Sequence, residues 1–401
     1  MLLNDFYKQI IMNVNFEFLG SEPLDNVITF LNYKIDRAVF FGYQDVVNEQ
    51  KTRTENFLKK YCGVQEVQFN ILAQKDLNSV LRTLKKRINA ELAAENRIYV
   101  DLTDGESLIL IAFGMLDAEY RLPMHLYNIE KNELTELRGD RSLSKNVPER
   151  RVRLTCERYI ELYGGKINDA LHKDSKGAQN PGNRDLLNRV WELAAHYSRV
   201  WNPFVNLCHT YFLPDDDLSV CASAKSVRSA LAKGNSALIT EENLRKILKK
   251  LKEAEAITDL DCDENFYTFR YANETIKNYL WEGGSLLEQH VFQKYREGSD
   301  DCRVGVHIDW DGVIHPNAYN DVLNEIDVLV LRENIPTFIS CKSGNMRPEQ
   351  TLHALYELQT VADRFGGQYA KKILYTMQPL PGRIYYERAG EMGIEVEVVS
   401  S

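Results

Sequence analysis

The chain has 401 residues and a mass of 46.3 kDa, and at about 100–200 residues per domain it should form two or three domains. Hydrophobic residues make up 44% and charged residues 27%, which is typical of a globular chain with a large core. The formal net charge of −9 excludes a surface that is basic all over and grips nucleic acid indiscriminately. This charge is uneven: residues 1–150 sum to −3, residues 151–250 to +5 and residues 251–401 to −11.

The cysteine pattern and the N-terminus indicate the cellular compartment. Seven cysteines are scattered without a C-x-x-C pair, which is typical of free thiols in a reducing environment. The first 20 residues lack the basic start, long apolar run and small-residue cleavage site of a signal peptide. No window approaches the roughly 18 uninterrupted apolar residues of a membrane span. We therefore expect a cytoplasmic protein with no membrane partner.

The first 130 residues alternate strand and helix patterns. The strands are expected at Asn15–Leu19, Arg37–Phe41, Glu66–Leu72 and Arg97–Leu102, and the helices at Leu24–Asn32, Val46–Tyr61, Leu77–Leu92 and Leu108–Leu116. This alternation predicts a parallel α/β sheet with helices on both faces. Ligands of such sheets bind beyond the carboxyl ends of the strands, so Gly20–Pro23 and Thr103–Ser107 are the candidate ligand loops.

Residues 155–250 have a predominantly helical pattern. Thr240 is a candidate N-cap, followed by two acids in the first turn of a basic helix. A strand is expected at Phe266–Tyr271. A helix followed by a short β wing resembles a winged-helix element, and a helical spacer that packs two domains together is the alternative.

Aromatic residues in this middle segment have two interpretations. Trp191, Trp201 and Phe204 occur near Arg189 and Arg199, a combination that can stack single-stranded bases. The commoner explanation is that these aromatic rings form the core of the helical segment.

A second α/β unit is expected from Gly283 onward. Its elements are a helix at Ser285–Tyr295 with Ser285 as candidate N-cap, strands at Cys302–Trp310, Ile326–Leu331 and Thr337–Cys341, a helix at Gln350–Phe365 and a strand at Ile373–Met377. This order predicts a compact mixed sheet.

Three charged residues in this last unit point to metal-dependent chemistry. Asp327 lies in one strand and Lys342 at the end of the next, and the short Arg332–Pro336 turn predicts a hairpin that brings the two side by side. Glu288, one turn into the preceding helix, completes the cluster. Carboxylates suit hard cations such as Mg²⁺ or Mn²⁺, and a neighbouring ammonium stabilises charge that builds on a phosphate. Alone, however, this spacing is also that of ordinary charges at strand ends.

Four segments carry a resemblance to a known family: Gly283–Glu288, Asn324–Val330, Phe338–Gly344 and Tyr356–Gly367. In order and local pattern they resemble the PD-(D/E)xK nuclease domain of the CRISPR ancillary nucleases. Chains of that family join an N-terminal CARF sensor domain to a C-terminal restriction-endonuclease-like domain. The resemblance implies that Glu288 is the helix acid, Asp327 the metal-binding aspartate and Lys342 the motif lysine.

The sequence departs from the family pattern at one position. An acid usually stands two residues before the lysine, where this chain has Ser340. Glu325 or Asp309 could supply the missing charge, or Glu288 and Asp327 could suffice. The resemblance also implies that the backbone carbonyl of Cys341 is a metal ligand, while a nucleophilic role for its thiol lacks a histidine partner.

The N-terminal part resembles the Rossmann-like CARF sensor of cyclic oligoadenylate. Gly20, Ser21 and Glu22 fall in the first strand-end loop of that family. Residues 103–107 fall where the family has a Thr-Gly-Gly-Thr-Lys type of loop, and its members here are Thr103, Asp104, Gly105, Glu106 and Ser107. Only the threonine and the glycine match, and the usual lysine is absent. Backbone amides at a helix N-terminus can still bind phosphate, although two acids beside a polyanion would weaken binding.

We therefore expect three domains: a CARF-like Rossmann sensor at residues 1–150, a helical linker with a winged-helix-like element at 151–282, and a PD-(D/E)xK nuclease-like domain at 283–401. The resemblance implies a homodimeric endonuclease that uses Mg²⁺ or Mn²⁺ and cleaves DNA or RNA when it binds a cyclic oligoadenylate, with the tetra-adenylate favoured. Two alternatives stay open: a catalytically impaired regulator that senses nucleotides, and a restriction-type nuclease that needs no activator.

Overall fold

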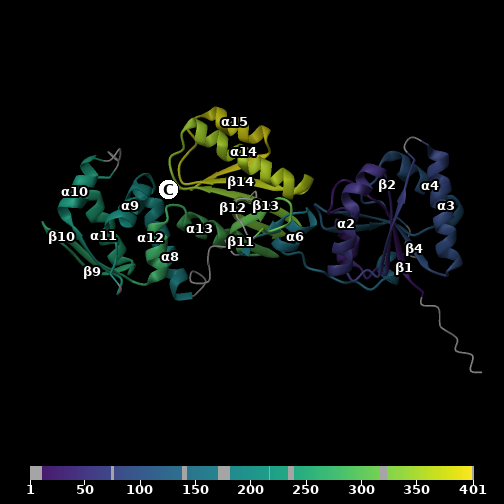
Figure 1. Ribbon diagram of the computed structural model, residues 1–401, viewed down its shortest axis with the longest axis horizontal. Helices are drawn as coiled ribbons and strands as arrows, with labels where there is room; N and C mark the ends of the chain where they lie inside the picture. The colour runs from purple at the N-terminus through teal and green to yellow at the C-terminus, as the bar shows by residue number, and fades with distance from the viewer. Residues whose placement is uncertain are drawn as a thin grey trace, which may run out of the picture. The chain divides into compact units, whose positions relative to one another are not determined.

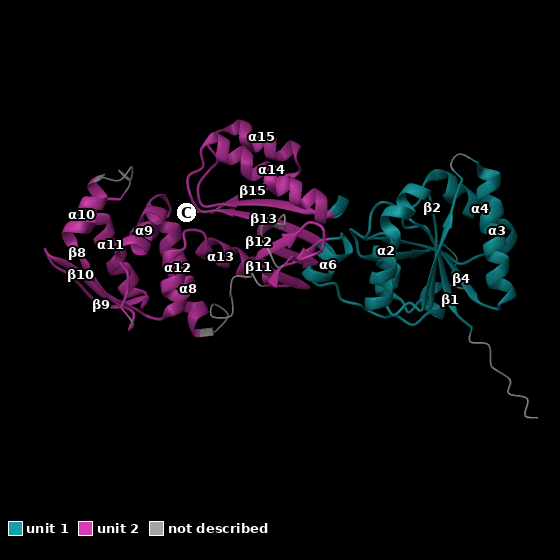
Figure 2. Ribbon diagram, in the orientation of Figure 1, with its two compact units in different colours: residues 1–164, 333–335, 367–369 teal, residues 165–332, 336–366, 370–401 magenta. Residues whose placement is uncertain are grey.

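The computed structural model describes residues 11–73, 76–137, 142–169, 181–215, 217–233, 239–315 and 323–399. The chain forms two compact units (Figures 1 and 2). The first unit contains residues 1–164, 333–335 and 367–369, and the second contains 165–332, 336–366 and 370–401. The predicted boundaries near 150 and 282 stay predictions, and residues on both sides of position 282 belong to the second unit.

The first unit is built on a six-stranded sheet in the order β3-β2-β1-β4-β5-β6. Its strands are β1 (Asn13–Phe18), β2 (Arg37–Gly42), β3 (Glu66–Ile71), β4 (Arg97–Asp101), β5 (Met124–Asn128) and β6 (Glu133–Glu136). The first five pair in parallel and β6 pairs antiparallel with β5. The parallel α/β sheet predicted from the sequence is confirmed.

Helices cover both faces of this sheet. The helices of this unit are α1 (Ile28–Asn32), α2 (Gln44–Tyr61), α3 (Leu77–Ala93), α4 (Ser107–Tyr120), α5 (Leu143–Asn146) and α6 (Cys156–Leu162). Figure 1 shows α2 on one side of the sheet and α3 and α4 on the other. One core lies between the sheet and the α3–α4 pair, where Phe41 packs against Phe16 and Phe113. Helix α1 is shorter than expected because the residues just before it form turns.

The middle of the chain contributes helices and a small sheet to the second unit. The helices are α8 (Pro181–His196), α9 (Ser198–Tyr211), α10 (Ala224–Lys233), α11 (Glu241–Glu253) and α12 (Glu274–Trp281). Strands β8 (Ser219–Ser223), β10 (Phe266–Tyr271) and β9 (Ile257–Cys262) form an antiparallel sheet in that order. The sequence predicted only β10 of the three. The winged-helix reading remains an interpretation, with α11 followed by the β9–β10 pair as its structural basis.

The aromatic residues of this segment are largely structural. Trp201 and Phe204 are buried in a continuous hydrophobic core that also contains residues of the C-terminal sheet. The core explanation is therefore correct for these two side chains, which do not offer an exposed face to a base.

The C-terminal sheet has the order β15-β14-β13-β12-β11-β7. Its strands are β7 (Lys166–Ile167), β11 (Asp301–Asp309), β12 (Leu323–Arg332), β13 (Ile335–Lys342), β14 (Lys371–Thr376) and β15 (Ile394–Val398). Antiparallel pairing holds β7, β11 and β12, and parallel pairing holds β13, β14 and β15. The expected mixed sheet is confirmed, with β7 and β15 as additional edge strands.

Helices α13 (Ser285–Arg296), α14 (Pro348–Phe365) and α15 (Arg383–Glu391) accompany this sheet, and a 3₁₀ turn, η3 (Gly367–Tyr369), follows α14. The expected N-cap of α13 is wrong: Gly284 is the cap residue, and the Ser285 hydroxyl instead donates to Glu282 at 2.6 Å. None of the helices in the described ranges is long and apolar enough to cross a membrane.

The N-cap of α11 provides a test of the middle segment. The Thr240 hydroxyl accepts a hydrogen bond from the backbone N–H of Asn243 at 3.2 Å. Replacing Thr240 with Ala should lower the free energy of unfolding by about 1 kcal/mol, because a helix N–H loses its partner. Urea denaturation measures this loss. Thr240→Ser, which keeps the hydroxyl, should be nearly neutral, and equal losses in both variants would contradict the capping role.

Candidate functional site

The β12–β13 hairpin places an aspartate against the backbone of the neighbouring strand. The turn consists of Glu333 and Asn334, which both have positive φ angles, of 50° and 68°. Across the hairpin, the Cys341 backbone N–H donates to Asp327 Oδ2 at 2.6 Å, and Ser340 Oγ donates to the same oxygen at 3.3 Å. The hairpin expected from the sequence thus brings these residues together.

Lys342 lies beside this carboxylate. Its Nζ is 3.8 Å from Asp327 Oδ2, and both side chains retain some exposure to solvent. Burial raises the pKa of Asp327, while the Lys342 ammonium and the Cys341 N–H act to lower it and Glu325 acts to raise it. Because burial has the largest effect, the pKa of Asp327 is raised and its ionised form is disfavoured, and the Lys342 ammonium offsets part of this effect.

Glu288 approaches the same place from α13. Its side chain is buried, and a Cβ on Gly284 would lie only 3.0 Å from its Oε1. The pKa of the Cys341 thiol is raised well above its ordinary value, first by burial and then by Asp327 and Glu288. Both carboxylates therefore lie within electrostatic reach of Cys341, and its thiol stays neutral, which argues against a nucleophilic role.

The oxygen donors of Glu288, Asp327 and Cys341 are of the type that a magnesium-type cation prefers. Within the described part of the chain, no group of three or more His, Cys, Asp or Glu side chains is arranged to hold a metal. Mg²⁺, however, is commonly held by only one or two carboxylates and retains several waters. Glu288 and Asp327, together with the Cys341 carbonyl, would supply such a set.

Asp309 and Glu325, the two candidates to replace the acid that is absent at Ser340, have other partners in the structure. The Asp309 side chain accepts backbone N–H groups of Asp311 and Val313, so it caps the turn that follows β11. Glu325 lies 3.8 Å from His307 Nε2, and its charge also raises the pKa of Asp327. Of the two, only Glu325 is close enough to Asp327 for its charge to act on the pKa of that carboxyl.

In the first unit, the two predicted ligand loops meet. Strands β1 and β4 are neighbours in the sheet although β2 and β3 intervene in sequence, which creates a topological switch point at their carboxyl ends. Gly20 follows β1, and a Cβ at this position would overlap the carboxylate of Asp104, which follows β4. The Asn26 side chain also bonds the Gly20 N–H and carbonyl, each at 3.0 Å.

Beneath these loops lies a buried polar network that sequence reasoning missed. Asp101 Oδ1 accepts from the Thr103 N–H at 2.8 Å and from its hydroxyl at 2.5 Å. Asp101 Oδ2 accepts from Thr29 Oγ1 at 2.5 Å and lies 3.3 Å from His125 Nε2. These bonds and His125 keep the pKa of Asp101 below its usual value in spite of burial. The sequence feature that could have indicated this network is Asp101 itself, an acid at the end of the largely apolar β4 strand.

The acids of the ligand loops have partners within the first unit. Gly105 N–H donates to Asp104 at 2.6 Å, and the Tyr43 hydroxyl donates to Glu106 at 2.8 Å. Glu22 accepts from the Tyr163 hydroxyl and, at 2.9 Å, from the backbone N–H of Gln368. By contrast Ser21 and Ser107 are exposed.

A further contact involves the segment 367–369, which belongs to the first unit. The Tyr369 hydroxyl donates to Asp25 at 2.8 Å, and Gln368 Nε2 donates to its other oxygen at 3.3 Å. Burial raises the pKa of Asp25 to about 7, although the Tyr369 bond acts in the opposite direction. Sequence reasoning did not identify this pairing, because its members are more than 340 residues apart.

Comparisons with known proteins identify the C-terminal segment. Residues 276–397 match the family model described as Card1-like, endonuclease domain. The resemblance to CRISPR ancillary nucleases is confirmed. A comparison with curated proteins finds no match.

Two solved structures share the fold over nearly the whole chain. Protein VC1899 from Vibrio cholerae is 17% identical with a TM-score of 0.69, and the match covers 96% of this chain and 94% of that one. Can2 from Sulfobacillus thermosulfidooxidans, solved in complex with cyclic tetra-adenylate, is 16% identical with a TM-score of 0.64, covering 97% and 94%. This chain therefore has a Can2-like fold with a Card1-like endonuclease domain.

Glu17 provides a pH test of the buried network. This β1 carboxyl is about 1% exposed, and burial, followed by the charges of Asp101, Asp104 and Asp25, raises its pKa well above 4.5. Ionisation therefore disfavours the folded state, so the wild type should lose stability as the pH rises above the unfolded pKa. Each unit of pKa difference corresponds to about 1.4 kcal/mol.

We therefore expect Glu17→Gln to be more stable than the wild type at pH 8, with an advantage that shrinks toward pH 4. Thermal denaturation across this range measures the difference. Glu133→Gln, at an exposed position on β6, is the control. A stability difference for Glu17→Gln that does not change with pH would contradict the assignment.

Proposed function

We propose that this protein is an endonuclease of type III CRISPR defence that hydrolyses DNA or RNA phosphodiesters and is activated by a cyclic oligoadenylate. The observation that carries the proposal is the Asp327 carboxylate held between the Cys341 N–H and the Lys342 ammonium, within a segment that matches a Card1-like endonuclease domain.

Each residue of the proposed site has a distinct task. Glu288, Asp327 and the Cys341 carbonyl would bind Mg²⁺ or Mn²⁺, which when bound polarises a phosphoryl oxygen and lowers the pKa of a water. The hydrogen bond from the Cys341 N–H fixes the orientation of Asp327. Lys342 would stabilise the negative charge that builds on the phosphate. Ser340 acts as a hydrogen-bond donor to Asp327 in the place where relatives have an acid.

The ligand loops provide the proposed sensor. Gly20, Ser21 and Glu22 from one loop and Thr103–Ser107 from the other meet at the switch point, where such sheets bind ligands. The exposed hydroxyls of Ser21 and Ser107 and the amides at the start of α4 would contact a cyclic oligoadenylate. The Can2 structure was solved with cyclic tetra-adenylate, which favours that ring size.

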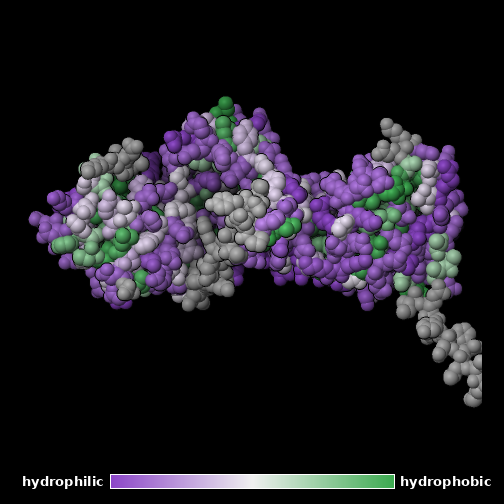
Figure 3. Space-filling view, in the orientation of Figure 1, coloured by the Kyte–Doolittle hydropathy of each residue, from purple (hydrophilic) through white to green (hydrophobic). Residues whose placement is uncertain are grey.

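A second copy of the chain would complete this sensor. Figure 3 shows hydrophobic residues that interrupt the otherwise hydrophilic surface of the first unit. On α4, directly after the second ligand loop, Leu110, Ile111 and Met115 are 36%, 54% and 51% exposed. A homodimer would remove such side chains from water, and a twofold-symmetric ligand suits a twofold-symmetric dimer.

The nuclease proposal is tested with the full chain, Mn²⁺, plasmid and single-stranded DNA or RNA substrates, and cyclic tetra-adenylate. The wild type should cleave at least one substrate. Asp327→Asn should lower the rate about 100-fold or more, because a neutral amide neither binds the cation as well nor attracts Lys342. Gel-based rates measure the change. Asp363→Asn, an exposed acid on α14, serves as the control.

The same assay separates the two alternatives. Ser340→Glu restores the usual acid, so cleavage by this variant alone would show that the natural chain is a binding protein or regulator. Cleavage that does not depend on the cyclic nucleotide would show an ungated nuclease. A folded dimer that cleaves nothing under any of these conditions would refute the enzymatic proposal.

Ligand binding is tested separately by thermal shift. Cyclic tetra-adenylate should raise the melting temperature of the wild type by several degrees, because it binds only the folded state. Gly20→Ala should abolish this shift, since the added Cβ would overlap Asp104 and separate the loops. Gly390→Ala, at a helical glycine whose Cβ would meet nothing within 4 Å, should retain the full shift. Equal shifts in both variants would disprove the proposed binding place.

A further inference from the structure

A side chain from the middle of the sequence reaches the turn that opens α13 and the loop that follows Lys342. Asn202 lies in α9, between the buried Trp201 and Pro203. In one orientation of its amide, Nδ2 donates to the Gly283 carbonyl at 3.2 Å and Oδ1 accepts from the Gly344 N–H at 3.3 Å, while Ser343 Oγ lies 3.2 Å from Oδ1.

The contact also ties these two segments directly to each other. Ser343 Oγ lies 2.7 Å from the Gly283 carbonyl, so this carbonyl is approached by both the serine hydroxyl and the asparagine amide. A Cβ on Gly344 would lie 3.1 Å from the end of the Asn202 side-chain amide. The absence of a side chain at Gly344 therefore allows the close approach of the amide.

The two tied segments carry opposite sides of the proposed nuclease site. Gly283 and Gly284 lead into α13, and the Gly284 carbonyl accepts the backbone N–H of Glu288 at 3.1 Å. Ser343 follows Lys342 directly, and the Lys342 carbonyl accepts from the Met377 N–H at 3.1 Å. The spacing between the helix acid and the strand-end lysine thus depends on how this turn and this loop are held.

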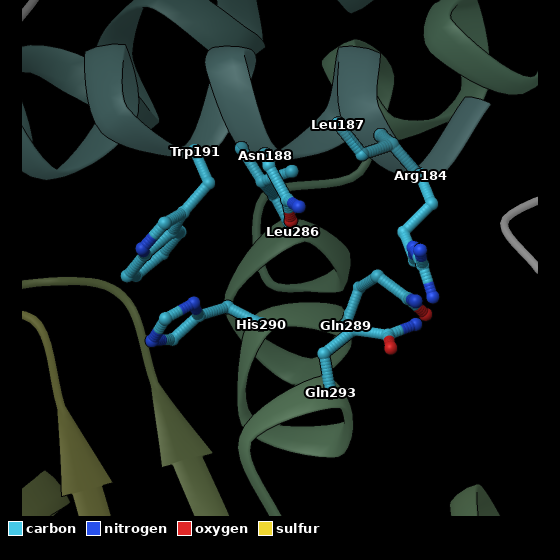
Figure 4. A pocket seen from close by; sticks show the side chains of 8 residues that line it. All are labelled: Arg184, Leu187, Asn188, Trp191, Leu286, Gln289, His290 and Gln293. Carbon is cyan, nitrogen blue, oxygen red and sulfur yellow. The ribbon is translucent and has the colours of Figure 1, made fainter. Parts of the chain in front are cut away.

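The remainder of α13 is braced by a second helix from the middle of the chain. Figure 4 shows Trp191 of α8 lying over His290 of α13, and the two rings stack with centroids 4.1 Å apart and an interplanar angle of 13°. The pKa of His290 is lowered to about 4, mainly by burial, so the ring is neutral at physiological pH. Helix α8 thus packs against α13 at His290, while Asn202 of α9 contacts the residues just before the first turn of α13.

We infer that Asn202 is a positioning residue of the nuclease site, which fixes the Gly283–Gly284 turn against the Ser343–Gly344 loop and thereby sets Glu288 relative to Lys342. This inference rests on the proposed function and adds a residue outside the matched segment 276–397. We call the contacts of Asn202 with Gly283 and Gly344 the Asn202 clamp. A misplacement of about 1 Å in a catalytic group can lower a rate about 100-fold. Because Gly344 is only two residues from Lys342, loss of the clamp should have a measurable effect on the rate.

The direct test is hydrogen exchange of the full chain without substrate. In Asn202→Ala, the amides of Gly283–Glu288 and of Ser343–Gly344 should exchange faster than in the wild type, with the remainder of the protein unchanged. The matched control is Asn206→Ala, which removes the same type of side chain one turn later in α9 at an exposed position. Unchanged exchange in either segment of Asn202→Ala would overturn the clamp, whether or not the protein proves to be a nuclease.

The kinetic test uses the same variants with Mn²⁺, activator and substrate. Asn202→Ala should lower kcat about 10- to 100-fold and change KM less than about 3-fold, because the groups that bind substrate remain. Asn202→Asp keeps the acceptor oxygen for Gly344 and should recover part of kcat. If Asn202→Ala does not fold, Asn202→Asp is compared with the wild type instead. Faster exchange with kcat within 2-fold of the wild type would overturn the positioning role.

A double-mutant cycle isolates the contact itself. Ser343→Ala removes the hydroxyl that joins Asn202 to Gly283, so the effects of Asn202→Ala and Ser343→Ala on kcat should be far from additive. Additive effects would show that the two side chains act separately and would refute the clamp. If the wild type cleaves nothing, the proposed function fails, and the cycle is then read from the exchange rates of Gly344.

Discussion

The antiparallel pairing of β12 with β13 is the constraint on which the proposed nuclease site depends. This pairing gives the Asp327 carboxylate a backbone N–H from the neighbouring strand, and it brings the Lys342 ammonium to 3.8 Å. A shift of one residue in register would turn these side chains to opposite faces of the sheet. The short turn at Glu333 and Asn334 protects the register, because two residues with positive φ leave little freedom for slippage.

In the first unit, acidic residues surround the place proposed for an anionic ligand. Its candidate ligand loops carry several acids, although the proposed ligand is an anion. Burial reduces the effective charge, because it raises the pKa of Glu17 and Asp25 so that they bind protons more readily. The Tyr43 hydroxyl donates to Glu106 and orients that carboxylate. A count that treats Glu17 and Asp25 as fully ionised therefore overstates how negative this edge of the sheet is near neutral pH.

Local patterns in the sequence predicted most of the strands and helices. The order of strands and helices before residue 130 and after Gly283 follows from runs of apolar residues and their periodicity, and the Asp327–Lys342 pairing follows from a short turn between two strands. The cap of α13 could not be predicted reliably, because serine and glycine both suit this position and the nearby Glu282 binds the serine hydroxyl. Strands β8 and β9 were missed because they are short, partly polar and stabilised by pairing with β10.

The residues that sequence reasoning missed have long-range partners. Asp101 meets His125 and Thr29, and Asn202 meets residues about 80 and 140 positions away. Such contacts leave no periodic signal, since each depends on the packing of several elements. The acid at the end of the β4 strand was visible in the sequence, but its buried partners were not.

The first unit is built from segments that are far apart in the sequence, which limits how it can be transferred to another protein. Gln368 and Tyr369, which donate hydrogen bonds to Glu22 and Asp25, lie more than 200 residues beyond Gly164, where the continuous part of the unit ends. A chimera that carried only residues 1–164 onto another effector would lose these donors and leave two carboxylates beside the candidate ligand loop without them. A portable form of the proposed sensor would therefore need the N-terminal segment together with the 3₁₀ turn that follows α14.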